Sequence, residues 1–117
     1  MADSWPTELK LGKDKRTLTV AFDDGRSFTL PAELLRVLSP SAEVQGHSPE
    51  QRVTVPRKRN VGIVGLEPVG NYAVRIVFND GHNTGLYVWD YLRDLGENQE
   101  IRWQSYVDEL AAKGLSR

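Results

Sequence analysis

The 117-residue chain contains no cysteine, and its only histidines are His47 and His82. The lack of cysteine excludes disulfides, iron–sulfur ligation, thiol nucleophiles and cysteine-based zinc sites. It fits a reducing compartment without requiring one. No apolar run reaches the length of a signal peptide or a membrane span. The net charge is only −1, so no overall field favours nucleic acid or an anionic membrane. We therefore expect a cytoplasmic protein with no membrane association.

Recognisable catalytic motifs are also missing. The chain has no G-x-S-x-G, P-loop or dinucleotide-binding fingerprint. The stretch VGIVG at 61–65 resembles a glycine-rich loop, but it lacks further glycines and a following helix. Its glycines are therefore expected at strand bulges or close packing points. The acidic pairs at 23–24 and 79–80 fall in expected turns, where solvation opposes the raised carboxyl pKa that acid–base catalysis needs. The sequence predicts neither an enzyme nor a cofactor.

The composition that remains is that of a folded domain. Apolar residues make up 39% and charged residues 26% of the chain, which is a globular balance rather than a disordered one. A chain of 117 residues can bury one modest core. We therefore expect a single domain over 1–117, with its core at about 5–96.

Residues 15–30 predict a β-hairpin. Large apolar side chains alternate with small ones over 17–22, which is the period of a half-buried strand. Asp24-Gly25 comes next, and Asp-Gly between two such runs is the strongest short-range hairpin signal. After the return strand, Pro31 suits the first turn of a helix, which we expect to end before Pro40.

The same pattern recurs in the second half of the chain. Residues 72–78 predict a strand, 79–82 a turn and 84–87 a return strand, and a helix comes after them that Gly96 can end as its C′ residue. The FDDG of 22–25 aligns with the FNDG of 78–81, and the Leu-Arg step of 35–36 aligns with that of 92–93. We therefore predict a duplicated β-hairpin–helix unit.

The other segments complete an α+β domain with a mainly antiparallel sheet. Residues 61–67 predict a further strand, with a turn at 68–71. Residues 39–60 predict a long loop with one short strand around 53–55. Apolar residues at helical spacing over about 100–113 predict an amphipathic C-terminal helix docked on the sheet.

His82 lies in the second predicted turn and is the first candidate for chemistry. As a structural residue it would form hydrogen bonds across the hairpin, and the equivalent position in the first half, Arg26, is no metal ligand, which favours this role. The alternative is a weak metal site shared with His47, although nothing in the spacing requires the ligands to converge. Oxygen ligands for that site would come from Glu43, Asp80 or Asp90.

A basic run and an aromatic cluster are two further candidates. Arg52 and the Arg57-Lys58-Arg59 triplet favour a solvated loop, with a phosphate- or partner-binding patch as the alternative. Tyr87, Trp89 and Tyr91 could stack nucleic-acid bases, but their i, i+2 spacing divides them between faces. A stacking platform would also interleave basic residues with the rings. We expect these aromatics in the core and no nucleic-acid partner.

Three stretches together carry a resemblance to a known family. They are TVAFDDGRSFTLPAELLR at 19–36, SPSAEVQGH at 39–47 and GLEPVGNYAVRIVFNDGHNTGLYVWDYLRDLG at 65–96. From about Trp5 to Gly96 the chain resembles the gamma-butyrobetaine hydroxylase-like N-terminal domain. That domain is also found as small stand-alone bacterial proteins of unknown function.

The resemblance implies a zinc site that has lost its ligands. In the hydroxylase relatives the domain precedes an Fe(II)/2-oxoglutarate oxygenase domain and binds a structural zinc through C-x-C-x-x-C and a later histidine. Ser39, Ser41 and Val44 stand at the cysteine positions here, and His82 keeps the histidine position. Serine is a poor zinc ligand and valine is none, so we expect no metal. Oxygenase chemistry is not implied, because its iron ligands belong to the separate catalytic domain.

Similar domains are also appended to P-loop scaffold ATPases of iron–sulfur cluster assembly in plants, which by analogy implies a docking module. Our hypothesis is a non-enzymatic interaction or adaptor domain with a protein partner, accessory to Fe–S or metal-cofactor protein maturation. The alternative is a weak metal-binding protein that uses His47 and His82. The candidate partner-binding residues are Glu43, Gln45, His47, Asp80, His82, Arg57, Lys58 and Arg59.

Overall fold

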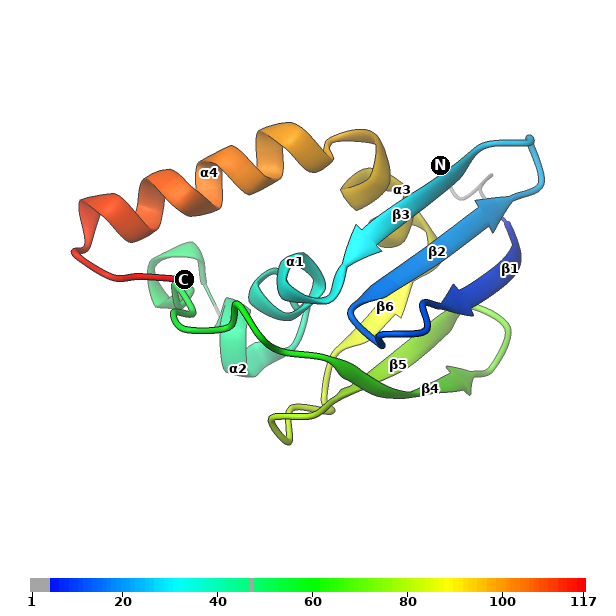
Figure 1. The fold of residues 1–117 in the computed structure, drawn as a ribbon, viewed down its shortest axis with the longest axis horizontal. Helices are drawn as coiled ribbons and strands as arrows, with labels where there is room; N and C mark the ends of the chain where they lie inside the picture. Colours follow the sequence, from blue (N-terminus) through cyan, green and yellow to red (C-terminus); the bar gives the residue numbers. More distant parts are fainter. Residues whose placement is uncertain (1–4, 47) are drawn as a thin grey trace.

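In the computed structural model, which describes residues 5–46 and 48–117, each half of the chain folds as three strands and a helix (Figure 1). The first half contains β1 (Pro6–Leu11), β2 (Thr17–Phe22), β3 (Ser27–Pro31) and α1 (Ala32–Val37). The second contains β4 (Ile63–Val69), β5 (Ala73–Phe78), β6 (Leu86–Val88) and α3 (Trp89–Glu97). A short helix α2 (Ala42–Gln45) and a 3₁₀ turn η1 (Pro49–Gln51) lie between the halves, and α4 (Gln99–Ala112) comes after α3.

The two central hairpins confirm the predicted duplication. Gly25 and Gly81 adopt φ angles of 87° and 92°, a conformation that glycine accepts without strain. In each turn the carboxylate of the Asp before the glycine accepts a hydrogen bond from a backbone N–H. These bonds run from Arg26 to Asp24 and from His82 to Asp80, both at 3.1 Å. The same Asp-Gly chemistry therefore closes both hairpins.

The repeated unit is longer than a hairpin and a helix, because a strand precedes each hairpin. β1 pairs with β2, and β4 pairs with β5, so the strands form two three-stranded sheets in which every pair is antiparallel. The register of β4 shifts between Ile63 and Gly65, which places a bulge within the VGIVG stretch as expected.

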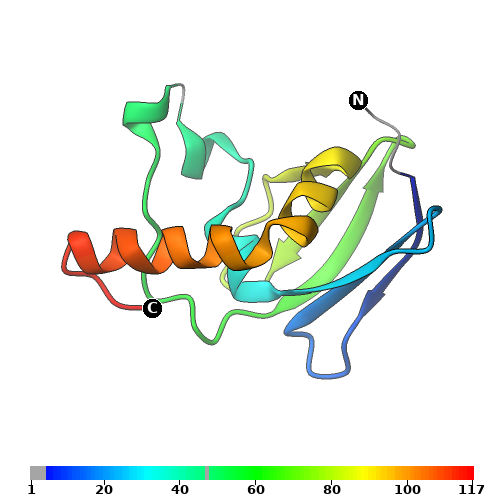
Figure 2. The ribbon, with the colours of Figure 1, turned by 90° about the horizontal axis from the view of Figure 1, so that it is seen from above.

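Both sheets turn one face toward a common core. Val20 of β2 and Ile76 of β5 are fully buried, as are Leu35 of α1 and Leu92 of α3. The alternation of the strands produces this face, because every second side chain points to the same side. Figures 1 and 2 show the sheets at one end of the molecule and α2 with most of α4 at the other.

The segment between the halves differs from the prediction, because no strand forms around 53–55. The backbone there is held from two sides instead: Val53 N–H donates to the carbonyl of Val44 at 2.7 Å, and the Tyr106 hydroxyl donates to the carbonyl of Val55. No neighbouring strand in the described residues is available to extend a ladder, so α2 and α4 supply partners for this backbone.

The two C-terminal helices also correct two expectations. Gly96 does not end α3, which continues to Glu97; it allows close packing, because a Cβ there would lie 2.5 Å from Cγ of Phe28. α4 forms where predicted, but it does not pack mainly on the sheet as expected. Its buried Tyr106 contacts the 52–55 segment, and α3 is the element that it contacts most. None of the helices in the described part of the chain has the length and apolar composition needed to cross a bilayer.

Candidate interaction surface

Asp80 in the second hairpin turn is the centre of a charged cluster. Its Oδ2 accepts hydrogen bonds from Nε of Arg36 on α1 at 2.8 Å and from Nζ of Lys58 at 2.7 Å. Partial burial alone would raise the pKa of Asp80, but the bonds from Lys58, the His82 N–H and Arg36 lower it to about 2. The carboxylate therefore stays ionised and ties the turn to α1 and to the basic run.

Two equivalent ion pairs connect the two halves of the chain. Arg36 from the first helix reaches Asp80 in the second turn, and its counterpart Arg93 from α3 reaches Asp24 in the first turn at 2.7 Å. Each helix is thus fastened to the hairpin of the other half. The two pairs differ in burial: the Arg36 and Asp80 side chains are 12% and 19% exposed, whereas Asp24 is 47% exposed. The Arg36–Asp80 pair is the more buried of the two, and Nη1 of Arg36 has no hydrogen-bond partner among the described residues.

His82 joins the turn to α2. Its side chain is only 3% exposed and lies between Ser39 and Glu43, with Nε2 at 2.9 Å from the Ser39 Oγ and Nδ1 at 3.0 Å from the Glu43 carboxylate. A carboxylate can only accept, so Nδ1 carries a proton and donates to Glu43, and a neutral ring then accepts from the Ser39 hydroxyl at Nε2. Burial, followed by the nearby Arg36 charge, lowers the pKa of His82 and outweighs the effect of Glu43.

The order Ser39, His82, Glu43 is that of a serine hydrolase triad, which the sequence interpretation did not assemble. A catalytic serine must reach its substrate, yet Ser39 is fully buried. Its Oγ also accepts from the backbone N–H of Ser41 at 3.2 Å, and a Cβ at Gly85 would lie 2.5 Å from it. The geometry holds two segments together and leaves no approach to the hydroxyl.

The four positions of the implied zinc site lie close together but do not fit a metal. Ser39 contacts His82 directly, the Ser41 Oγ hydrogen-bonds the Thr84 Oγ1 at 2.6 Å, and Val44 packs in the core. Two ligands of a tetrahedral zinc lie roughly 3.3–3.7 Å apart, given bonds of about 2.0–2.3 Å. The 2.9 Å between the Ser39 Oγ and the His82 Nε2 is shorter than that. The three polar positions are held by hydrogen bonds instead, Ser39 to the His82 imidazole and Ser41 to the Thr84 hydroxyl.

The described residues do not supply ligands for the alternative metal site at His47 and His82. Within residues 5–46 and 48–117, no group of three or more His, Asp or Glu side chains could hold a metal ion. His47 itself lies outside the described residues. Glu43 and Asp80 flank His82, but each is already bound to it or to neighbouring cations.

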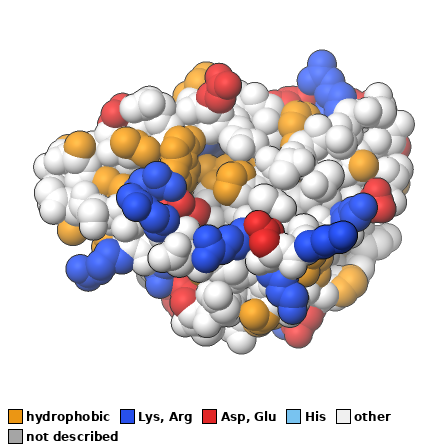
Figure 3. Space-filling model, in the orientation of Figure 1, with side chains coloured by type: hydrophobic (Ala, Val, Ile, Leu, Met, Phe, Trp, Pro, Cys, Tyr) orange, Lys and Arg blue, Asp and Glu red, His pale blue; other side chains and the backbone are white. Residues whose placement is uncertain are grey.

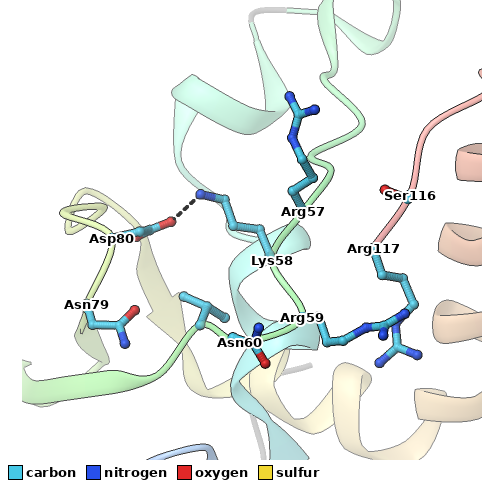
Figure 4. Close-up of a pocket in the computed structure, with 9 residues that line it drawn as sticks. Arg57, Lys58, Arg59, Asn60, Asn79, Asp80, Ser116 and Arg117 are labelled. Atoms are coloured by element: carbon cyan, nitrogen blue, oxygen red, sulfur yellow. Dashed lines mark ion pairs between the residues drawn. The ribbon is translucent and has the colours of Figure 1, made fainter.

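The basic run divides into two parts. Arg52 pairs with Glu109 of α4, whereas residues 57–59 line a pocket of about 580 Å³ together with Asp80 and the C-terminal segment. Figure 3 shows several basic side chains over this face, and Figure 4 shows Lys58 pointing toward Asp80 while Arg57 and Arg59 extend from the same loop in other directions. Both arginines are exposed and have no side-chain partner among the described residues.

Seven of the eight candidate partner-binding residues therefore lie in three segments that contact one another. Gln45 on α2 donates to the Ser39 carbonyl at 2.9 Å, beside Glu43 and His82. Lys58 connects the basic run to Asp80. The eighth, His47, is outside the described residues. We call the α2 segment 41–45, the turn 79–82 and the loop 57–59 together the interaction surface.

The three aromatics considered for base stacking lie at the sheet–helix junction. The hydroxyls of Tyr87 and Tyr91 donate to the carbonyls of Leu35 and Leu38, and Tyr87 is fully buried. The Trp89 Nε1 donates to the Asn71 carbonyl at 2.9 Å. These rings pack and cap backbone groups, so they do not form a stacking platform.

The sequence interpretation missed Arg36 and Gly85, which lie outside the interaction surface and contact the residues that support it. The signal for Arg36 was present, because the Leu-Arg step and the turn Asp are repeated together in both halves. Gly85 carried no local signal, since its role is a close approach to a side chain from another segment.

Known structures and a family model identify the relatives of this fold. The model described as gamma-butyrobetaine hydroxylase-like, N-terminal, matches residues 9–93. One solution NMR structure shares 48% identity with a TM-score of 0.83, over 97% of this chain and 90% of that chain. A second shares 51% identity with a TM-score of 0.85, over 100% and 88%.

A more distant relative carries a family name of its own. A crystal structure of a protein of unknown function from Acidithiobacillus ferrooxidans, which belongs to the DUF971 family, shares 38% identity with a TM-score of 0.64, over 78% of this chain and 91% of that chain. No curated protein matches the chain. The family-model match and these structures show that the chain belongs to the gamma-butyrobetaine hydroxylase-like N-terminal domain family.

Proposed function

We propose that this chain is a non-enzymatic interaction domain that binds a partner protein through the interaction surface. The observation that carries the proposal is the convergence of charged groups from three segments around Asp80 and His82. The buried part of the cluster is held by internal hydrogen bonds, whereas Glu43, with a 63% exposed side chain, and Arg57 and Arg59 remain available to a partner. Rigid polar anchors with an exposed charged rim suit protein recognition.

The same contacts are the reason for proposing no catalytic role. Ser39 is the hydroxyl paired with a base in the cluster, and it is fully buried. Asp80 has a lowered pKa and is held by two cations, so it is a poor general base. The burial of Ser39 and the ion pairs of Asp80 support a structural role for both.

The finer part of the proposal concerns the pathway. We place the partner among proteins that mature Fe–S or metal-cofactor proteins, and this placement rests on the family resemblance. The proposal includes no metal bound to this chain. The residues at the ligand positions implied by the resemblance, Ser39, Ser41 and His82, are hydrogen-bonded to one another or to neighbouring side chains.

Partner capture with matched variants tests the proposal. Tagged wild-type protein and the variants Glu43→Lys and Glu100→Lys would be compared in quantitative pull-downs from cell extract, after ¹H–¹⁵N spectra confirm folding. Glu100 lies on α4, is exposed and gives the same charge change outside the surface. We expect at least one protein to be lost with Glu43→Lys and retained with Glu100→Lys. A set of captured proteins that is identical for all three would refute the proposal.

A further inference from the structure

The exposed cations without partners are not spread evenly over the molecule. Most Lys and Arg side chains in the described part of the chain form an ion pair or a side-chain hydrogen bond. The exceptions all lie in two segments, one at the end of β1 with the following turn and one in the 57–59 loop. They are Lys10, Lys13, Lys15, Arg16, Arg57 and Arg59, and all six are exposed. We call these six residues the basic face.

The fold brings these two segments together. The backbone N–H of Ile63, at the start of β4, donates to the carbonyl of Lys15 at 2.7 Å. A Cβ at Gly62 would lie 3.2 Å from the same carbonyl, so the chain leaving the 57–59 loop runs directly against the β1–β2 turn. Figure 3 shows Lys and Arg side chains in a band across this face. The net charge of −1 conceals this band, because it sums over the whole chain.

Acidic side chains offset the band only weakly. Asp14 lies in the same turn and Glu8 is exposed on β1, so two carboxylates face the six cations of the basic face. Asp80 lines the pocket beside the 57–59 loop but is paired with Arg36 and Lys58. Other exposed acids without ion pairs include Asp90 on α3 and Asp108 on α4. The molecule therefore has a positive side at the β1–β2 turn and the 57–59 loop, and a polyanion would be attracted to that side.

A recess lies at one end of the basic face. The pocket of about 580 Å³ is lined by Arg57 and Arg59 together with the amides of Asn60 and Asn79 (Figure 4). Arg57 has a φ of 58°, and its N–H is held by the carbonyl of Ser116 at 2.9 Å. A left-handed conformation is costly for a residue with a Cβ, so this backbone is fixed by its surroundings. Planar guanidinium groups that lack a partner here match carboxylate geometry.

We infer that the basic face binds an acidic segment of the partner protein, with Asp or Glu side chains along the band and one of them in the pocket. This inference rests on the proposed function and names the chemistry of the partner. A nucleic acid would offer the same charge, but single strands also need exposed rings for stacking. The exposed aromatics in the described residues, Trp5 and Tyr72, lie beside the β2–β3 and β4–β5 turns, at the far ends of the strands from this band.

Fluorescence anisotropy with the full chain tests the inference. The probes are a labelled peptide of alternating Glu and Gly, the same peptide with Gln in place of Glu, and a single-stranded oligonucleotide of equal charge. The double variant Arg57→Gln/Arg59→Gln is compared with Arg26→Gln/Arg75→Gln, which removes the same charge from exposed, ion-paired arginines. We expect the Glu peptide to bind, to weaken roughly tenfold or more in the first variant and less than about twofold in the second.

Three results would overturn the inference: tighter binding of the oligonucleotide than of the Glu peptide, equal weakening in both double variants, or no binding of the Glu peptide. The pull-down separates this failure from that of the proposed function. If Glu43→Lys loses a partner that Arg57→Gln/Arg59→Gln still captures, the interaction surface stands and the acidic-segment inference fails. If neither variant loses a partner, the proposed function fails as well.

Discussion

Replacing Asp80 with Asn tests whether the charged cluster stabilises the fold as its geometry implies. The wild-type carboxylate accepts from Arg36 at 2.8 Å, from Lys58 at 2.7 Å and from the His82 N–H at 3.1 Å. The Asn amide oxygen can keep the bond to the backbone, but the variant loses the negative charge that compensates Arg36. Because the Arg36 side chain is only 12% exposed, its charge is then left poorly solvated.

The size of the expected loss in the free energy of unfolding follows from the pKa of Asp80. A fall from 3.8 to about 2, at about 1.4 kcal/mol per pKa unit, corresponds to about 2 kcal/mol of stability near neutral pH. This figure already includes the lost attraction of Arg36 and Lys58, so we expect Asp80→Asn to lose about 2–3 kcal/mol. The folded pKa is depressed, so the contribution is complete above 3.8 and is lost as the pH falls through about 2.

Urea unfolding, monitored by tryptophan fluorescence and circular dichroism, measures the loss. Asp24→Asn is the matched control. Asp24 has the equivalent place in the first turn and pairs with Arg93, the counterpart of Arg36, but its side chain is more exposed. We expect the control to lose clearly less. Near pH 3 the stability gap between wild type and Asp80→Asn should fall by about half its charge-dependent part. Equal losses in the two variants, or a gap that does not change with pH, would refute the reasoning.

Three further predictions concern packing, protonation and reactivity. Gly96→Ala should cost about 1–3 kcal/mol in urea unfolding, because its Cβ would lie 2.5 Å from Phe28, whereas Gly65→Ala, with its nearest neighbour at 3.9 Å, should cost less than about 1 kcal/mol. The pKa of His82, measured by NMR, should lie below 6.5, so the folded protein should lose stability as the pH drops below 6.5 and keep it above that value. A pKa above 6.5 would contradict the burial of the ring. A fluorophosphonate probe should not label the protein, and labelling that Ser39→Ala abolishes would contradict a non-enzymatic role.

The hairpins could be predicted from the sequence because their determinants are local. Asp-Gly turns and alternating side chains act within a few residues, so both turns form as expected at 22–27 and 78–82. The second return strand, predicted at 84–87, forms at Leu86–Val88 instead. β1 was missed because its alternation is weak: Leu9 and Leu11 are only partly buried. The segment 52–55 was misassigned because its conformation depends on Tyr106 and Glu109, which lie more than 50 residues away along the chain.

Placement of the site depended on information of two kinds. The family resemblance brought Ser39 and His82 into one prediction, and the structure puts their side chains 2.9 Å apart. The partners that define the chemistry, Glu43, Arg36 and Lys58, come from three different segments. No periodicity or spacing encodes such contacts, because they depend on how the halves pack. Arg52, by contrast, looked like part of the basic run and belongs to the contact with α4 instead.

The duplication also explains why only one of the two equivalent turns carries a candidate site. Arg26 and His82 hold the same position in their turns, yet Arg26 has a 63% exposed side chain and His82 a 3% exposed one. The difference comes from the connection that leaves each helix. α1 leads into residues 39–45, which cover the second turn and supply Ser39 and Glu43, whereas α3 leads directly into α4. The long connection after α1 thus encloses the second turn in a hydrogen-bonded network with a charged rim. The difference between the two connections, rather than the repeat itself, sets the place of the interaction surface.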